Sequence, residues 1–127
     1  MEKPPKPTGA ELAILQVLWQ RGPSTVKEVH KVLDAARKTG YTTVLKFMQI
    51  MVEKGLVRRD ESTFAHVYEA RMPQEHTQRT LIADLLERAF EGSTSRLILQ
   101  ALAAKKASPE ELAEIRKILN NHERGSK

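Results

Sequence analysis

The chain has 127 residues and a net charge of +5, and its 40% hydrophobic and 29% charged residues are typical of a globular protein. The absence of cysteine excludes disulfides, thiolate metal sites and cysteine nucleophiles. No apolar run approaches the roughly 18 residues of a membrane span. The first ten residues also lack the apolar stretch of a signal peptide. These features predict a cytoplasmic protein with no membrane association of its own.

Two helix starts with the same sequence pattern lie in the first thirty residues. Thr8 is followed three residues later by Glu11, and Thr25 is followed in the same way by Glu28. Each pair is a capping box, in which the threonine and the glutamate satisfy each other's backbone N–H groups. Apolar residues at helical spacing follow each start, and Gly22 with the proline after it ends the first helix.

A third helix and a hairpin follow. Thr42 is expected to be the N-cap of the helix, after a turn at Gly40, and Gly55 stands where a C-terminal glycine cap belongs. The inward face of this helix is Val44, Phe47, Met48 and Met51. Two strand-like runs, 56–61 and 65–70, are joined by a short link. Three helices followed by a hairpin is the element order of a winged helix-turn-helix.

The remainder of the chain is predicted to be helical, over about 74–91, 94–104 and 109–122. A segment of this size buries little surface by itself, so its apolar stripes need something to pack against. We interpret the segment as a dimerisation region that completes its core with a second copy. The alternative is that it folds back on its own winged helix. The predicted dimerisation residues are Leu81, Leu85, Leu86, Phe90, Leu97, Ile98, Leu102, Leu112, Ile115 and Leu119.

The predicted fold class is therefore mainly α with a small β-hairpin wing. Residues 1–7, rich in proline and lysine, are expected to form a disordered arm. The winged helix-turn-helix, a DNA-binding domain, is assigned to 8–72, and the helical dimerisation region to 73–127.

Positive charge is concentrated in the middle of the winged helix. Between residues 26 and 59, eight Lys or Arg residues stand against three acidic residues. Clustered positive charge indicates a polyanionic partner, although a solvated basic face gives the same pattern. The sequence therefore needs a second signal to favour nucleic acid.

That second signal is the outward face of the third helix, because the N-terminal part of such a helix meets base edges in the major groove. Threonine offers a hydroxyl and a methyl group, lysine reaches phosphate or guanine, and glutamine pairs well with adenine. Arginines on the first strand add a basic wing. The predicted DNA-binding residues are Tyr41, Thr42, Thr43, Lys46, Gln49, Ile50, Arg58 and Arg59.

Catalysis finds no support in the sequence. The four histidines are scattered, none has metal-ligand spacing, and there is no nucleotide-binding loop or catalytic triad pattern. The protein is predicted not to be an enzyme and to use neither a metal nor a cofactor. Two alternatives stay open: a winged helix used for protein contact, and a regulator that senses a small ligand. For the latter, the candidate ligand residues are Thr94, Arg96 and Gln100.

Three stretches of the sequence resemble the penicillinase-repressor family, the BlaI–MecI type of winged-helix regulator. They are PTGAELAILQVLW, GYTTVLKFMQIMVEKGLVRRDE and HVYEA, and TTVL followed eight residues later by KGLV is the most specific part. The resemblance covers nearly the whole chain. It implies a cytoplasmic homodimer that binds double-stranded palindromic operator DNA and represses transcription. It also implies release by a partner membrane metalloprotease sensor that triggers cleavage in the dimerisation region.

The chain departs from the family pattern at three points. Many relatives have arginine where this chain has Ile50, so the operator sequence does not carry over. The best-known members are cut at an Asn-Phe pair in the fifth helix, and the corresponding residues here are Gln100 and Ala101. This argues against cleavage at that point. The members that respond to copper use C-terminal cysteines, which this chain lacks.

Overall fold

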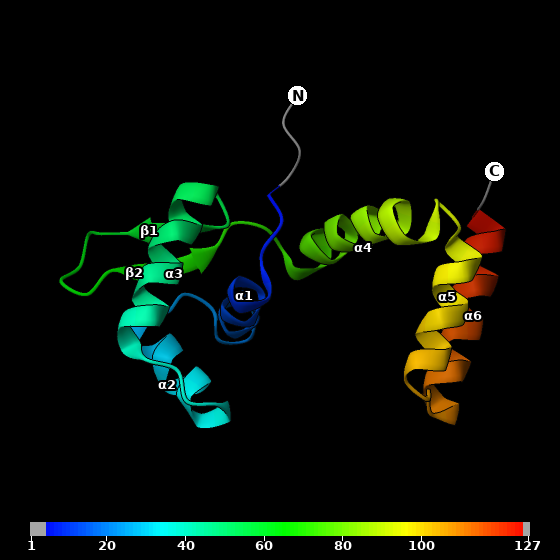
Figure 1. The fold of residues 1–127 in the computed structure, drawn as a ribbon, viewed down its shortest axis with the longest axis horizontal. Coiled ribbons are helices and arrows are strands. Elements are labelled where there is room, and N and C mark those ends of the chain that lie inside the picture. Colours follow the sequence, from blue (N-terminus) through cyan, green and yellow to red (C-terminus); the bar gives the residue numbers. More distant parts are fainter. Residues whose placement is uncertain (1–4, 126–127) are drawn as a thin grey trace. The chain divides into compact units, whose positions relative to one another are not determined.

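The computed structural model describes residues 5–125, so most of the predicted N-terminal arm lies outside the described residues. The chain divides into two compact units, with the boundary between Ala83 and Asp84. The elements are α1 (Gly9–Arg21), α2 (Val26–Ala36), α3 (Tyr41–Lys54), β1 (Val57–Asp60), β2 (Val67–Ala70), α4 (Gln74–Phe90), α5 (Thr94–Ala104) and α6 (Pro109–Gly125) (Figure 1). This order confirms the predicted fold class, a winged helix-turn-helix followed by helices.

The two predicted capping boxes are both present. In α1, the Glu11 N–H donates to Thr8 Oγ1 at 3.3 Å and the Thr8 N–H donates to Glu11 Oε1 at 2.9 Å. In α2, the Glu28 N–H donates to Thr25 Oγ1 at 3.2 Å and the Thr25 N–H donates to Glu28 Oε1 at 2.9 Å. Reciprocal bonds of this kind satisfy N–H groups that have no partner inside the helix.

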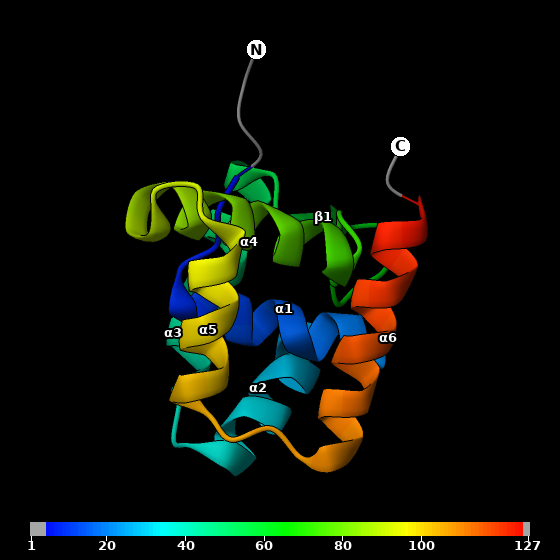
Figure 2. The same ribbon diagram turned by 90° about the vertical axis from the view of Figure 1, so that its right-hand side faces the viewer.

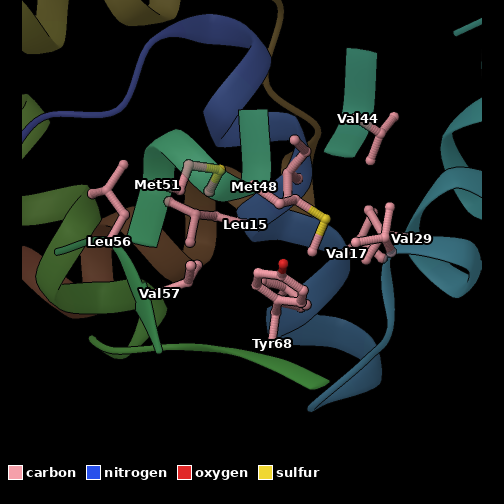
Figure 3. Packing of buried hydrophobic residues seen from close by; sticks show 12 residues of the cluster. Leu15, Val17, Val29, Val44, Met48, Met51, Leu56, Val57 and Tyr68 are labelled. Atoms are coloured by element: carbon pink, nitrogen blue, oxygen red, sulfur yellow. The ribbon is translucent and has the colours of Figure 1, made fainter. Parts of the chain in front are cut away.

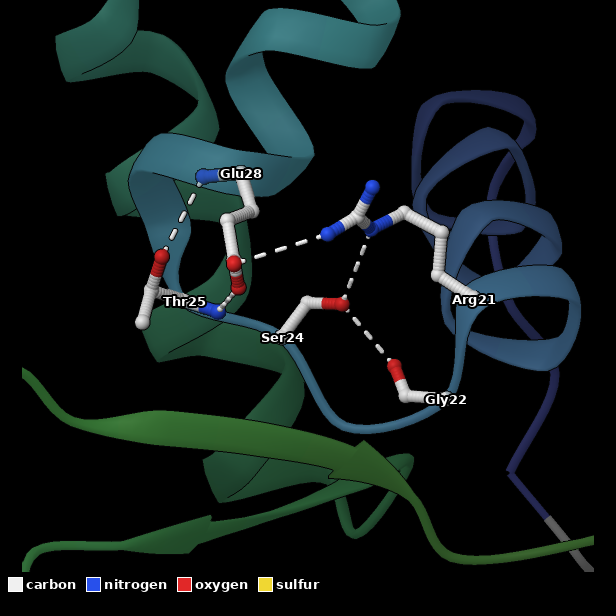
Figure 4. Close-up of polar contacts among 5 residues, drawn as sticks. All are labelled: Arg21, Gly22, Ser24, Thr25 and Glu28. Carbon is white, nitrogen blue, oxygen red and sulfur yellow. Dashed lines mark hydrogen bonds and ion pairs between the residues drawn. The ribbon is translucent and has the colours of Figure 1, made fainter.

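The turn between α1 and α2 is held by side chains from both helices (Figure 4). Arg21 donates from Nε to Ser24 Oγ at 3.4 Å, and its guanidinium lies 3.5 Å from the Glu28 carboxylate. The backbone N–H of Thr25 and the charge of Arg21 hold the pKa of Glu28 below its ordinary value. Ser24 also exchanges two backbone hydrogen bonds with Tyr68, at 2.8 and 2.9 Å. The turn therefore extends the hairpin by one further strand-like bridge.

The core of the winged helix lies between α1, α2, α3 and the hairpin (Figure 3). Tyr68 on β2 and Met48 on α3 are at most 2% exposed. The methionine side chains are flexible enough to fill the space around the tyrosine ring. The buried apolar residues are Ile14, Leu15, Val17, Leu18, Val26, Val29, Val44, Met48, Met51, Leu56, Val57 and Tyr68.

The hairpin is antiparallel, with Val57 opposite Ala70 and Asp60 opposite Val67. Both strands are shorter than predicted. Ala65 and His66, which the alternating pattern assigned to the second strand, lie in the loop. The reason is local: the Asp60 carboxylate and the Thr63 hydroxyl bond to loop backbone groups, and so divert the backbone from the ladder.

The second compact unit contains the end of α4 together with α5 and α6, and the latter two run in opposite directions (Figure 2). Ser108 caps α6 as predicted, accepting from the Glu111 N–H at 3.0 Å. Neither α5 nor α6 has a buried residue. Their large exposed apolar side chains are Ile98, Leu99, Leu102, Ile118 and Leu119.

Gly55 ends α3 in the left-handed region, with φ +81°, as the sequence predicts for a C-terminal glycine cap. An alanine there should lower the free energy of unfolding by about 1–2 kcal/mol, because its Cβ is strained in this conformation. A Cβ at Gly55 would meet nothing closer than 3.5 Å, so the cost comes from the backbone and not from a clash. Urea unfolding followed by the fluorescence of Trp19, the single tryptophan, measures it.

Gly9→Ala is the matched control for this prediction. Gly9 lies in the first turn of α1, and a Cβ there would meet nothing within 4 Å. The control should leave the free energy of unfolding unchanged or raise it by less than about 1 kcal/mol. Equal effects of the two substitutions would contradict a role for the left-handed conformation at Gly55.

Candidate nucleic-acid interface

Helix α3 divides cleanly into a buried and an exposed face. Val44, Met48 and Met51 are no more than 1% exposed and pack into the core. Because a helix repeats every 3.6 residues, the intervening side chains lie on the opposite side. Of the predicted DNA-binding residues on α3, those exposed to solvent are Tyr41, Thr42, Thr43, Lys46 and Gln49. Ile50 is only half-buried. The structure thus brings these six residues together on one helix.

The N-terminus of α3 differs from the prediction. Gly40, and not Thr42, is the N-cap, and it makes no side-chain cap hydrogen bond. The Gly40 carbonyl accepts from the Val44 N–H at 3.1 Å, so the helical ladder begins earlier than predicted. The hydroxyl of Thr42, in the first turn of the helix, is therefore not a cap. It stands on the exposed face.

His30 on α2 fixes the turn that leads into α3. Its Nε2 lies 2.8 Å from the carbonyl oxygen of Thr39, and its ring meets the Tyr41 ring edge to face at 5.7 Å between centroids. The Thr39 N–H donates to the Asp34 carboxylate at 3.2 Å. These contacts order the turn of the helix-turn-helix and explain why the helix begins at Tyr41. The histidine lies nine residues before Thr39, so sequence spacing gave no signal for it.

The other end of α3 is tied to α1 by a largely buried ion pair. Lys54 Nζ lies 2.7 Å from Glu11 Oε1, and the side chains are 33% and 3% exposed. Burial alone would raise the pKa of Glu11. The hydrogen bonds from Lys54 and from the Thr8 N–H outweigh it and hold that pKa below its ordinary value of 4.5. Sequence reasoning assigned Glu11 only a capping role and missed this pair.

The two wing arginines both face carboxylates of the wing itself. Arg58 stands opposite Glu69 in the hairpin, with 3.6 Å between charged atoms. Arg59 is hydrogen-bonded to the side chains of Tyr68 and Glu61, and its Nε lies 2.8 Å from Glu61 Oε2. These hydrogen bonds raise the pKa of its guanidinium. Arg58 is the more exposed of the two, at 63% against 28%. The charge that the wing offers to a polyanion is therefore partly neutralised.

Other kinds of site find little support in residues 5–125. In this part of the chain, no group of three or more His, Asp or Glu residues is placed to hold a metal ion. No helix there is long and apolar enough to cross a membrane. The candidate ligand residues Thr94, Arg96 and Gln100 are all exposed on α5, and Arg96 pairs with Glu91 at 3.4 Å.

A winged helix whose third helix presents polar side chains, Lys46 among them, to solvent is typical of a DNA-binding transcriptional regulator. The family model of the penicillinase repressor matches residues 7–121. The chain belongs to the penicillinase repressor family.

Two relatives agree with this assignment, and a solved structure has the same fold. The transcriptional regulator BlaI of Mycobacterium tuberculosis is 32% identical over 116 residues, which are 91% of this chain and 83% of that protein. The penicillinase repressor of Bacillus licheniformis is 24% identical over 127 residues, or 100% of this chain and 99% of that protein. The solution structure of the DNA-binding domain of the repressor BlaI matches with a TM-score of 0.51 at 23% identity. The match covers 58% of this chain and 90% of that domain.

Proposed function

We propose that this chain is a transcriptional repressor that binds palindromic operator DNA as a homodimer. The exposed face of α3, with Thr42, Lys46 and Gln49 held outward by the burial of the opposite face, carries the proposal. A helix in this position of a helix-turn-helix lies in the major groove, with its first turns nearest the bases. The name of the family, penicillinase repressor, supports repression as the outcome of this binding.

DNA binding is tested by a gel shift of the full chain on its own promoter region at two salt concentrations. We expect a specific complex at submicromolar protein that weakens as salt rises, because phosphate contacts release counterions. The absence of any specific complex would contradict the proposal. A winged helix used only for protein contact would give that negative result.

The homodimer is supported by the second compact unit. Helices α5 and α6 of this unit expose large apolar side chains. Among them are the predicted dimerisation residues Ile98, Leu102 and Leu119. Isolated exposed leucines are ordinary, whereas a cluster of them is typical of an interaction surface. The predicted dimerisation residues Leu81, Leu86, Phe90, Leu97, Leu112 and Ile115 are half-buried, and Leu85 is exposed.

Truncation after Ala83, which keeps the first compact unit whole and removes every predicted dimerisation residue except Leu81, should yield a monomer. Its affinity for a palindromic duplex should fall by about 10²–10⁴-fold, because the second half-site no longer binds as part of the same molecule. Sedimentation velocity and anisotropy titrations measure the two effects. A truncated chain that still sediments as a dimer would contradict the assignment.

Point variants of the full chain provide a matched comparison. Leu102→Lys changes a predicted dimerisation residue, and Val32→Lys changes an apolar residue of α2 with nearly the same exposure, 38% against 39%. Only the first should dissociate the dimer, because it places a charge in the proposed interface. The same result would distinguish a dimer from a C-terminal segment that folds back on its own winged helix. In the second arrangement the wild-type chain and both variants would be monomers.

Release by a partner membrane metalloprotease sensor is the finer part of the proposal. Gln100 and Ala101 are both exposed on α5, in the middle of the helix. A protease binds its substrate as an extended strand, so the helical backbone, like the departure from the family's Asn-Phe pair, argues against a cut at this point of α5. A sensor gene beside this one would support the route. An intact repressor after induction would contradict it.

A further inference from the structure

Phe64 is fully exposed at the tip of the wing. Its relative exposure is 104%, whereas the other exposed large apolar residues of the first compact unit, Val32, Tyr41, Met72 and Ile82, lie between 39% and 47%. The free chain thus leaves a full phenylalanine surface in water. A partner that covers such a side chain gains about tenfold or more in affinity from its burial.

The loop that carries Phe64 is ordered by its own hydrogen bonds. The Ser62 N–H donates to Asp60 Oδ1 at 2.9 Å, which lowers the pKa of that carboxyl group. The Thr63 hydroxyl donates to the Ala65 carbonyl at 2.7 Å, so one bond closes around Phe64 itself. Less conformational entropy is therefore lost when this side chain contacts a partner.

The same loop has little charge with which to bind phosphates. Between residues 61 and 66 it contains no lysine or arginine, one exposed histidine, His66, and one acidic residue, Glu61, which pairs with Arg59. The two arginines at its base face carboxylates of the wing. What the tip offers to a partner is the apolar ring.

We propose that Phe64 enters the minor groove of the DNA that flanks the major-groove site of α3. The inference rests on the proposed DNA binding. Helix α3 and the hairpin share one core through Met51, Leu56 and Val57, and the loop projects beyond α3 (Figure 1). In homeodomains a segment beside the recognition helix reaches the adjacent minor groove, and in architectural proteins apolar side chains act there as wedges between base steps. Phe64 would then add affinity that does not depend on phosphate charge.

The test uses the full chain and the duplex that it selects best from a random library. Phe64→Ala should weaken binding by about fivefold or more, the size of a lost base contact. Phe64→Leu keeps an apolar side chain and should retain most of the affinity. Met72→Ala, an exposed apolar residue of the same compact unit, is the control and should change little.

A modified duplex locates the contact. Replacing adenine by 2,6-diaminopurine in the flanking step adds an amino group to the minor groove alone. The modification should weaken DNA binding by the wild-type chain and leave DNA binding by the Phe64→Ala variant unchanged. Equal sensitivity of the two chains, or full affinity of Phe64→Ala, would overturn the inference. So would loss of self-association in Phe64→Ala, because it would assign the ring to a protein contact. If the wild-type chain selects no duplex, the proposed function itself fails.

Discussion

Replacing Lys46 and Gln49 together by alanine should abolish specific DNA binding and leave the fold intact. Both side chains are exposed on the outward face of α3, so their removal leaves no cavity. Each lost base contact is expected to cost about 1–3 kcal/mol, so the double variant should lose most of its preference for the selected duplex. Anisotropy titrations with the selected and a scrambled duplex at one salt concentration measure this preference.

The control for this prediction changes the same residue types elsewhere. Gln78→Ala with Lys117→Ala removes an exposed glutamine on α4 and an exposed lysine on α6. It should lower affinity for both duplexes slightly, through net charge, and leave the preference unchanged. A double variant at Lys46 and Gln49 that still prefers the selected duplex would show that another face of the protein reads the bases.

Lys54→Met should destabilise the winged helix by about 1–3 kcal/mol at neutral pH, because it leaves the buried Glu11 carboxylate without its partly exposed ion-pair partner. The effect should depend on pH. The pKa of Glu11 lies below 4.5 in the folded protein, so the ion pair contributes fully above pH 4.5. That contribution is lost as the pH falls through the lowered folded value. The difference in the free energy of unfolding between wild type and variant should therefore become smaller at acidic pH.

Urea unfolding at pH 7 and at pH values below 4.5 measures this prediction through Trp19 fluorescence. Arg58→Met is the control, since the Arg58–Glu69 pair is exposed on the same winged helix. Loss of this exposed pair should lower the free energy of unfolding by less than about 1 kcal/mol. A Lys54→Met effect as small as that of the control, or one that stays constant in acid, would contradict the role assigned to the buried pair.

The features predicted correctly from the sequence are those that depend on neighbouring residues. Both capping boxes and the glycine cap at Gly55 follow from bonds that span a few residues, and the face of α3 follows from its repeat. The start of α3 was predicted wrongly because Thr42 has the side chain of a cap. The helix begins earlier, with Gly40 as its N-cap, and the preceding turn is held by contacts of His30 that a local pattern does not contain.

The parts of the site that were missed depend on residues far apart in the chain. Glu11 and Lys54 are 43 positions apart, and only the packing of α1 against α3 brings them together. The ion pair between Arg58 and Glu69 depends on the register of the hairpin. The length of the wing loop, and with it the exposure of Phe64, depends on hydrogen bonds made by Asp60 and Thr63.

Selection of duplexes from a random library by the full chain would show whether α3 reads DNA as part of a symmetric dimer. We expect an inverted repeat whose half-sites lie one or two helical turns apart, because two copies of α3 in a symmetric dimer must each reach a major groove. We also expect that the Lys46 and Gln49 double variant fails to enrich that repeat. Enrichment of no sequence, or of a single half-site without two-fold symmetry, would contradict it.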